Sequence, residues 1–208
     1  MTIATVHREL ALDLAGLAEA ESSGIAAFRV WTTDEPVVIV GRSVSIEEEV
    51  QVQFCHREGI EIVERPSGGR SVLIGPGTAQ YSFTLPYSLD DELGSISGSK
   101  SFCNRLLRSG SPELSALSED ASGDLLLGSR KVAGLALKRG RNAMLLHGTI
   151  LVAADLDLIA QALQHPKREP AYRAGRSHED FLENIGRLDS ARLVAAVNSE
   201  LKELGTGR

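Results

Sequence analysis

The residues of this chain that are best suited to chemistry fall in two short segments. The first is a basic glycine loop at residues 65–72, with the sequence Arg-Pro-Ser-Gly-Gly-Arg-Ser-Val. Its Gly-Gly pair lets backbone amides approach a ligand closely, and Arg65 and Arg70 offer forked donors for a phosphate or a carboxylate. The second segment, residues 129–134, places Lys131 on a predicted strand as a fixed positive charge. This combination suits an activated acyl group.

Strands must position both segments. Around the glycine loop, residues 60–64, 71–74 and 79–85 have the apolar and β-branched character of strands. Two longer strands are predicted near 130–138 and 142–152, joined by a glycine-containing turn as a hairpin. Lys131 would then lie at the start of the first hairpin strand.

The remaining elements follow from hydrophobic periodicity and from turn residues. Leu10, Leu14 and Leu17 recur at helical spacing and predict a helix near 7–21. Further strands are predicted at 27–31 and 36–41, further helices near 47–58, 100–108, 155–164, 178–185 and 189–204, and loops at 89–98 and 109–123. Strands, hairpins and helices in this mixture predict an α+β domain with a mixed, largely antiparallel central sheet flanked by helices.

The composition fits one globular domain. With 208 residues, 42% of them hydrophobic, the chain is long enough for one sizeable core, so we expect a single domain over residues 1–208 without a C-terminal accessory domain. No apolar run is long enough to span a bilayer. His7, Arg8, Glu9 and Asp13 interrupt the stretch that a signal peptide requires to be apolar, so we expect a cytoplasmic protein without membrane association. The net charge of -6 argues against broad nucleic-acid binding.

The two cysteines, Cys55 and Cys103, do not form a disulfide framework. Both fall in predicted helices and are interpreted as small buried hydrophobic residues. No cluster of Cys and His has the spacing of a structural metal site.

In order and spacing, the motifs resemble the lipoate-protein ligase and octanoyltransferase family, which shares a catalytic domain with biotin-protein ligases. The resemblance rests on residues 36–42, the glycine loop through Tyr81-Ser82-Phe83, residues 124–134 and the triplet His147-Gly148-Thr149. It implies a biotin/lipoyl ligase-like fold, similar to class II synthetases, in which Lys131 contacts the reacting acyl group. The residues that it implies around the acyl-adenylate are Arg65, Ser67, Gly68, Gly69, Arg70, Tyr81, Asp124, Gly134, His147, Gly148 and Thr149.

Several of these residues also have purely structural interpretations. Ser67 can stabilise the loop or contact a ligand, and Tyr81 can line an acyl tunnel or belong to the core. His147 lies in an apolar run, where a hydrogen-bonded structural histidine is usual. Gly148 suits close approach of a ligand or of an adjacent strand. Asp124 can brace the loop before the lysine strand, or can lie near nucleotide phosphates and magnesium as the resemblance implies.

The chain departs from the patterns of both branches of this family. Arg70 stands where ligases often carry a third glycine, and the Gly-Gly-Arg form is similar to the octanoyltransferase branch. That branch uses a cysteine nucleophile, either in the loop before the lysine or well after it, and this chain has a cysteine in neither place. Without a thiol, the transferase mechanism lacks its covalent acyl intermediate. We therefore expect an ATP-dependent ligase.

The resemblance then implies a reaction in two steps. Lipoate, or octanoate, reacts with ATP to give acyl-AMP, with Mg²⁺ near Asp124 offsetting phosphate charge, and a lysine of a lipoyl carrier domain then displaces AMP. The expected ligands are ATP, Mg²⁺ and lipoate, and the expected partners are the carrier domain and an accessory subunit for activation. Two alternatives stay open: an octanoyltransferase or amidotransferase that acts without ATP, and a non-catalytic acyl-binding homologue. A biotin-protein ligase is disfavoured because the Gly-Arg-Gly-Arg adenylate loop is absent from the matching region.

The turn of the predicted hairpin is cationic. Lys138, Arg139 and Arg141 lie there in a chain of net negative charge. We expect them to help dock an acidic carrier domain, the alternative being an ordinary solvated turn.

Overall fold

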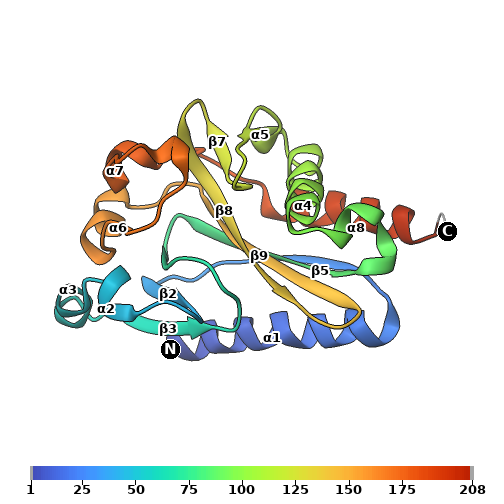
Figure 1. Cartoon of the computed structure of the whole chain (residues 1–208), viewed down its shortest axis with the longest axis horizontal. Helices are drawn as coiled ribbons and strands as arrows, with labels where there is room; N and C mark the ends of the chain where they lie inside the picture. The colour runs from blue at the N-terminus through green and yellow to red at the C-terminus, as the bar shows by residue number, and fades with distance from the viewer. Residues whose placement is uncertain (1, 207–208) are drawn as a thin grey trace.

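A six-stranded sheet forms the centre of the computed structural model, which describes residues 2–206 (Figure 1). The strand order is β1 (Ala27–Trp31), β5 (Thr78–Pro86), β9 (Ala143–Leu151), β8 (Arg130–Arg139), β7 (Leu125–Leu127) and β6 (Ser118–Glu119). Each neighbouring pair is antiparallel. The predicted hairpin is the β8–β9 pair, and the predicted α+β class with a largely antiparallel sheet is confirmed.

Helices cover both faces of this sheet. Helix α1 (Thr2–Ser23) runs along one face, while α4 (Ile96–Gly110) and α8 (Ser190–Thr206) lie on the other (Figure 1). On the α1 face, Leu17 and Ala20 of the helix pack against Ala143 and Leu145 of β9. The sheet is therefore shielded on both sides, so a buried polar group on it is costly unless it is hydrogen-bonded.

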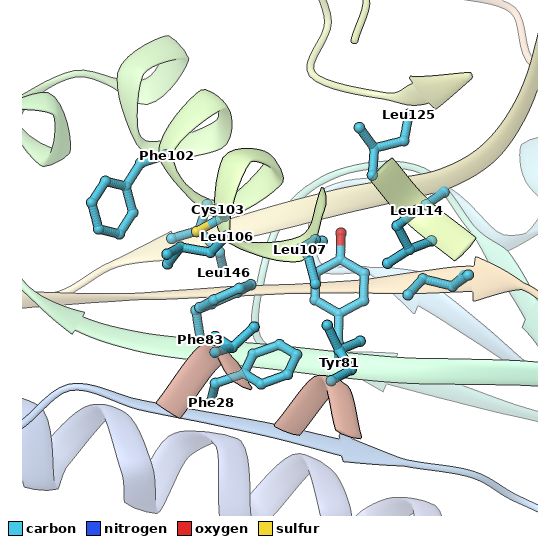
Figure 2. Packing of buried hydrophobic residues seen from close by; sticks show 14 of the residues in the cluster. Phe28, Tyr81, Phe83, Phe102, Cys103, Leu106, Leu107, Leu114, Leu125 and Leu146 are labelled. Carbon is cyan, nitrogen blue, oxygen red and sulfur yellow. The ribbon is translucent and has the colours of Figure 1, made fainter. Parts of the chain in front are cut away.

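The main hydrophobic core lies between the sheet and the α4–α8 layer. Figure 2 shows Phe28, Tyr81 and Phe83 beneath the side chains of α4, with the sulfur of Cys103 among them. The ring centroids of Phe28 and Phe83 are 4.5 Å apart. Because β5 alternates, its aromatic residues enter this core and its even-numbered polar residues face α1. Apolar burial of this kind is the main stabilising contribution to the fold.

A second sheet of three strands carries the glycine loop. Strand β2 (Val37–Gly41) pairs in parallel with β3 (Glu61–Arg65) and antiparallel with β4 (Val72–Ile74). The loop connects β3 to β4, so it leaves the small sheet and reaches over the large one. Short helices border this sheet: α2 (Ile46–Glu49), α3 (Val52–Arg57), α6 (Leu156–Ala162) and α7 (His178–Phe181).

The structure differs from the sequence-based elements in several places; the helix predicted near 178–185, for example, ends at Phe181, because Leu182 bridges to Lys131. The strands at 27–31 and 36–41 form, but they belong to two different sheets and not to one central sheet. The helix predicted at 47–58 is interrupted, because Val50 is extended at φ -126° and bridges to Leu163. The predicted loop at 109–123 contains helix α5 (Pro112–Ser115) and strand β6.

Among the described residues, the remaining elements are the 3-10 turns η1 (Tyr87–Leu89), η2 (Asp91–Gly94) and η3 (Ala171–Arg173). Asp189 caps α8, because its Oδ1 accepts a hydrogen bond from the amide of Arg192 at 3.0 Å. Within residues 2–206, no helix combines the length and apolar character that crossing a membrane requires.

Candidate active site

Arg65 folds the glycine loop around its own guanidinium. Its side chain is buried, and its Nη2 donates to the backbone oxygens of Gly68 at 2.7 Å and Arg70 at 2.8 Å. Its Nε donates to Ser67 Oγ at 3.0 Å. Burial lowers the pKa of Arg65 to about 10, so the group remains cationic at neutral pH. The Arg65 donors, which the sequence suggested for a phosphate or carboxylate ligand, are thus bonded to the loop itself.

Of the two loop glycines, Gly69 is the one whose backbone requires glycine. Its φ is +92°, and an added Cβ would lie 2.8 Å from Nη2 of Arg65. Gly41 of β2 approaches so closely that its own Cβ would lie 2.0 Å from the oxygen of Gly69. A Cβ on Gly68 would meet no atom within 4 Å. The close approach at Gly69 is thus to Gly41 and to the Arg65 side chain, and the predicted approach of the loop amides to a ligand stays a prediction.

A buried hydrogen-bond chain ties the loop to the large sheet and to α1. Ser67 Oγ lies 2.5 Å from His147 Nε2, and His147 Nδ1 lies 3.1 Å from Asp13 Oδ2. Arg29 Nε is 3.5 Å from the other oxygen of Asp13. With a carboxylate at Nδ1, the neutral imidazole carries its proton there, so Nε2 accepts from the Ser67 hydroxyl. Ser67 and His147 thus fasten the loop to the large sheet; His147 also lines the cavity described below, so a ligand contact for it stays a prediction.

The other end of the loop is fastened to α2. Arg70 forms an ion pair with Glu49, whose second carboxylate oxygen accepts the amide of Ser71 at 2.6 Å. Arg70 Nη2 also donates to the backbone oxygen of Arg168 at 3.0 Å. Glu49 is buried, so its charge needs this compensation.

Lys131 is held by a carboxylate that also accepts a hydrogen bond from a phenol. Its Nζ lies 2.9 Å from Asp124 Oδ1, and Tyr172 donates its hydroxyl to Asp124 Oδ2 at 2.8 Å. Burial, with the nearby charge of Asp124, raises the pKa of Tyr172, which keeps the phenol protonated as a donor. Gly134 provides the space for the ammonium, since an added Cβ would lie 2.6 Å from Lys131 Nζ.

The central strands meet closely beside this lysine. A Cβ on Gly148 would lie 2.2 Å from the oxygen of Gly134 and 2.5 Å from the Tyr81 hydroxyl. The absence of a side chain at Gly148 thus allows the adjacent strand β8 to approach closely. Tyr81 belongs to the aromatic core and also lines the cavity described in the next paragraph. Thr149 lies opposite Gly134 in the pairing of β9 with β8.

A cavity of about 440 Å³ collects most of these side chains. It is lined by Arg65, Gly69, Arg70, Tyr81, Asp124, Lys131, Gly134, His147, Gly148 and Thr149. Ser67 and Gly68 do not line it and lie in the loop behind its wall. Apolar side chains, among them Leu10, Trp31, Ile39 and Leu135, form another part of the wall, which suits an acyl chain.

Neither cysteine reaches this cavity. Cys103 is fully buried in the main core, and Cys55 is fully buried with its Sγ 3.8 Å from the oxygen of Ala162. Burial raises the pKa of both thiols. A nucleophilic thiol needs the opposite surroundings, namely access and a lowered pKa. The interpretation of both residues as buried hydrophobic groups is confirmed.

Sequence reasoning missed four residues that shape the site: Asp13, Glu49, Tyr172 and Arg173. From the sequence, Asp13 was considered only as a charge that argues against a signal peptide. Its position on the helix face that carries Leu10 and Leu17 could have indicated a buried carboxylate. Glu49 gave no such signal, because the sequence placed it in the first turn of a helix predicted over 47–58, and its position at the end of α2 is seen only in the structure. Tyr172 and Arg173 lie in a segment without periodicity, so the sequence offered no signal for them.

The cationic hairpin turn lies far from Lys131. Arg139 is eight residues from Lys131 along β8, which corresponds to roughly 26 Å of strand. Its Nε donates to the Tyr87 hydroxyl at 3.2 Å. Carrier docking at this turn stays a prediction.

The model of the family described as the Lipoyl protein ligase A/B catalytic domain matches residues 6–201. Lipoate-protein ligase 1 of Staphylococcus aureus is 29% identical over 142 residues, covering 66% of this chain and 41% of that protein. Octanoyltransferase LipM of Carboxydothermus hydrogenoformans is 28% identical over 188 residues, covering 79% and 67%. The chain spans about half the length of the curated relatives that it matches.

Two solved structures share the fold. The bi-partite lipoate protein ligase of Thermoplasma acidophilum, described with its E2 lipoyl domain, has a TM-score of 0.69 and 20% identity, covering 92% of this chain and 78% of that one. A lipoate-protein ligase A bound with ATP has a TM-score of 0.69 and 21% identity, covering 91% and 78%. At these identities the likeness is one of fold.

Proposed function

This chain belongs to the Lipoyl protein ligase A/B catalytic domain family, and on that premise we propose that it is an ATP-dependent lipoate-protein ligase. Lipoate, or octanoate, attacks the α-phosphate of ATP to form acyl-AMP and pyrophosphate. The ε-amine of a lysine on a lipoyl carrier domain then attacks the acyl carbon and releases AMP. The cytoplasm is the compartment that we propose for this reaction.

The observation that carries the proposal is the separation of the thiols from the cavity. A ligase needs no covalent intermediate on the enzyme, whereas a cysteine-dependent transferase needs a thiol at the acyl carbon. Cys55 and Cys103 are fully buried and do not line the cavity, while Lys131 does. Catalysis then rests on holding the adenylate and the amine together and on fixed charge.

Lys131 is the proposed catalytic residue. As the amine attacks, negative charge develops on the acyl oxygen and shifts to the leaving phosphate. An ammonium fixed beside both groups stabilises that change without reorganising at the moment of reaction. Asp124 and Tyr172 hold Lys131 from the side of the cavity that faces η3. The glycine loop, fastened at both ends, excludes water that would hydrolyse the adenylate.

Asp124 is the proposed protein ligand for Mg²⁺. No group of three or more His, Cys, Asp or Glu side chains that could hold a metal occurs within residues 2–206. Mg²⁺ is often bound by one or two carboxylates together with substrate phosphates, and Asp124 beside Lys131 fits that mode. When bound, the ion would offset phosphate charge.

The partners belong to the proposal as well. An E2 lipoyl domain accompanies the bi-partite Thermoplasma ligase, and we propose a lipoyl domain as the acceptor here. We also propose that a separate subunit assists adenylate formation, as the description of that ligase as bi-partite suggests. An assay that starts from preformed lipoyl-AMP bypasses this requirement.

Two observations favour a second candidate, an octanoyltransferase that acts without ATP. The relative LipM is an octanoyltransferase and matches 79% of this chain. Arg70 also gives the loop its Gly-Gly-Arg form. This candidate would require the acyl group to pass directly from a donor to the carrier lysine.

A mass measurement distinguishes the two candidates. The protein is mixed with unmodified lipoyl domain, lipoate and Mg²⁺, with or without ATP, and the domain is weighed. A parallel reaction starts from lipoyl-AMP, and another offers an octanoyl thioester donor without ATP. We expect modification from ATP or from lipoyl-AMP and none from the thioester; modification from the thioester alone would establish the transferase instead.

The Cys55→Ala, Cys103→Ala double variant is the matched control. The ligase proposal expects it to keep the activity of the parent, because neither thiol lines the cavity. An acyl thioester that survives denaturing mass spectrometry on either cysteine would contradict the proposal.

A further inference from the structure

Asn104 is a fully buried amide on helix α4. Its Nδ2 donates to the backbone oxygen of Gly123 at 3.0 Å. Because that partner is a carbonyl, the amide presents its nitrogen there, and the Oδ1 on its other side finds no partner among the described residues. Within residues 2–206, the bond to Gly123 is thus the only hydrogen bond of this side chain.

The peptide that Asn104 contacts is the one that joins Gly123 to Asp124. Its oxygen accepts from Asn104, and its amide, which belongs to Asp124, donates to Asp120 Oδ1 at 2.9 Å. A peptide unit is planar, so a hydrogen bond at each end fixes the rotation of the whole plane. That rotation sets ψ of Gly123 and φ of Asp124, and therefore the direction in which the Asp124 side chain leaves the backbone.

The turn that carries this peptide lies directly against α4. Gly123 donates its amide to the oxygen of Asp120 at 3.0 Å, and Asp120 donates its own amide to the oxygen of Asp124 at 3.1 Å. Gly123 has a φ of +86°, and an added Cβ would lie 2.6 Å from Cδ of Lys100. Lys100 also donates to the oxygen of Ser122 at 2.6 Å. The left-handed glycine thus allows the turn to approach the helix closely.

Asp124 transmits this constraint to Lys131. Its Oδ1 lies 2.9 Å from the Lys131 ammonium, and its Oδ2 accepts the Tyr172 hydroxyl at 2.8 Å. Because the side chain of an aspartate is short, the place of its oxygens depends closely on the orientation of its backbone. A series of contacts therefore runs from Asn104 through one peptide and one carboxylate to the lysine.

Other contacts hold the turn on α4 without Asn104. Lys100 supports the turn, and Ser101 donates to Glu119 Oε1 at 2.8 Å in the strand that precedes it. Among the described residues of α4, only Asn104 bonds to the peptide before Asp124. A buried amide with an unpaired oxygen is costly. These observations favour a role in orienting Asp124 over a role in holding the loop.

We propose that Asn104 is a positioning residue for acyl transfer, which fixes the peptide before Asp124 and so holds the Lys131 ammonium where negative charge develops. This inference rests on the proposed ligase function and adds to it a residue that does not line the cavity. Asn104 contacts neither the acyl group nor the nucleotide and transfers no proton. It acts because a charge that is already in place stabilises the transition state without reorganising.

The test is single-turnover transfer by the full chain, from saturating lipoyl-AMP to an unmodified lipoyl domain. Asn104→Leu keeps a branched side chain and removes the donor, and we expect it to lower the maximal rate roughly tenfold to a hundredfold. The affinity for lipoyl-AMP, measured without the lipoyl domain, should change much less, because the lysine is only misplaced for the transition state. In a Lys131→Ala background, Asn104→Leu should have no further effect.

Asn104→Asp tests the donor itself, because it keeps the shape of the side chain. An ionised carboxylate would face the Gly123 oxygen without a proton to donate. Burial raises the pKa of a carboxyl group, and the protonated group can donate to that oxygen. Transfer relative to the parent at the same pH should therefore be restored at low pH and lost as the pH rises through the pKa of the introduced carboxyl. A role in packing alone predicts no such pH dependence.

Ser101→Ala is the matched control. Ser101 lies on the same helix and donates to Glu119 beside the same turn, but it does not contact the peptide of Asp124. Its loss should leave transfer at the parental rate, and a thermal melt of each variant verifies folding. Labelling of Lys131 by an amine-reactive ester, relative to Lys138, needs no turnover. It should increase in Asn104→Leu, where the ammonium loses its fixed partner, and not in Ser101→Ala.

Several results would overturn the proposal. These are parental transfer by a folded Asn104→Leu protein, a loss that adds to that of Lys131→Ala, and a loss of affinity as large as the loss of rate. If Asn104→Leu does not fold, a flat pH profile of Asn104→Asp relative to the parent rejects the positioning role. The ligase function is judged separately, because a parent that transfers nothing from lipoyl-AMP rejects that function. Equal labelling of Lys131 in the parent and in Asn104→Leu would then reject the positioning role as well.

Discussion

Replacing Gly134 by alanine should disable the site while leaving the fold intact. The new Cβ would lie 2.6 Å from both Cε and Nζ of Lys131 and 2.9 Å from Asp124 Oδ1. Ordinary contact between such atoms needs about 3.5 Å, so the end of the lysine must move by roughly 1 Å. A shift of about 1 Å in a catalytic group lowers the rate by roughly a hundredfold. We therefore expect a loss of that size in acyl transfer.

The cost in stability should be small, because the displaced atoms end a flexible side chain. Gly134 has no positive φ, so alanine can adopt its strand conformation. The contrasting substitution is Gly148→Ala on the paired strand, where the Cβ would meet the backbone oxygen of Gly134 at 2.2 Å. That contact cannot be relieved by a side chain, and we expect a loss of at least about 1–3 kcal/mol in unfolding free energy.

The assay is single-turnover transfer from preformed lipoyl-AMP to an unmodified lipoyl domain, with thermal unfolding measured in parallel. In a Lys131→Ala background, Gly134→Ala should have no further effect on transfer, since both changes act on one group. A Gly134→Ala protein that melts like the parent and transfers at the parental rate would refute the reasoning. An additive loss in the double variant would also refute it, because Gly134 would then act independently of the ammonium.

Three further predictions concern the lysine, the loop and one histidine. Lys131→Ala should fold normally and lose roughly 10²- to 10³-fold in single-turnover transfer, by analogy with removed oxyanion donors; undiminished transfer would remove its catalytic role. Ser67→Ala and Asp13→Ala should each raise hydrolysis of lipoyl-AMP relative to transfer, and the double variant should be no worse than either single one if His147 links them. For His178, whose pKa falls from 6.5 to about 4 on folding, the unfolded state takes up the proton first as pH decreases. The unfolding free energy should thus fall between pH 6.5 and about 4 in the parent and less so in His178→Gln.

The sequence predicted the elements that depend on local patterns. The Gly-Gly pair between two strands located the loop, and the run from 130 to 152 with its central turn located the β8–β9 hairpin, because these signals lie within a few residues of one another. The same signals placed Lys131 at the start of β8. Local patterns also placed both cysteines on helices, where we interpreted them as buried hydrophobic residues.

The contacts that complete the site could not be predicted in this way. Asp13 and His147 are separated by 134 positions, so only the packing of α1 against β9 brings them together. Arg65 shows a different limit: sequence indicates a guanidinium beside a glycine loop but does not reveal that it faces loop carbonyls. The division into two sheets was missed because the parallel pairing of β2 with β3 depends on long-range contacts.

The central claim is that the acyl group is activated by ATP and never bonded to the enzyme. The most direct test is to measure AMP release and lipoyl-domain modification together, using the Cys55→Ala, Cys103→Ala variant with ATP, lipoate and, where activation requires it, the accessory subunit. We expect one AMP to be released for each domain modified, and no modification when ATP is omitted. Modification without ATP, or the loss of all activity with the two thiols, would contradict it.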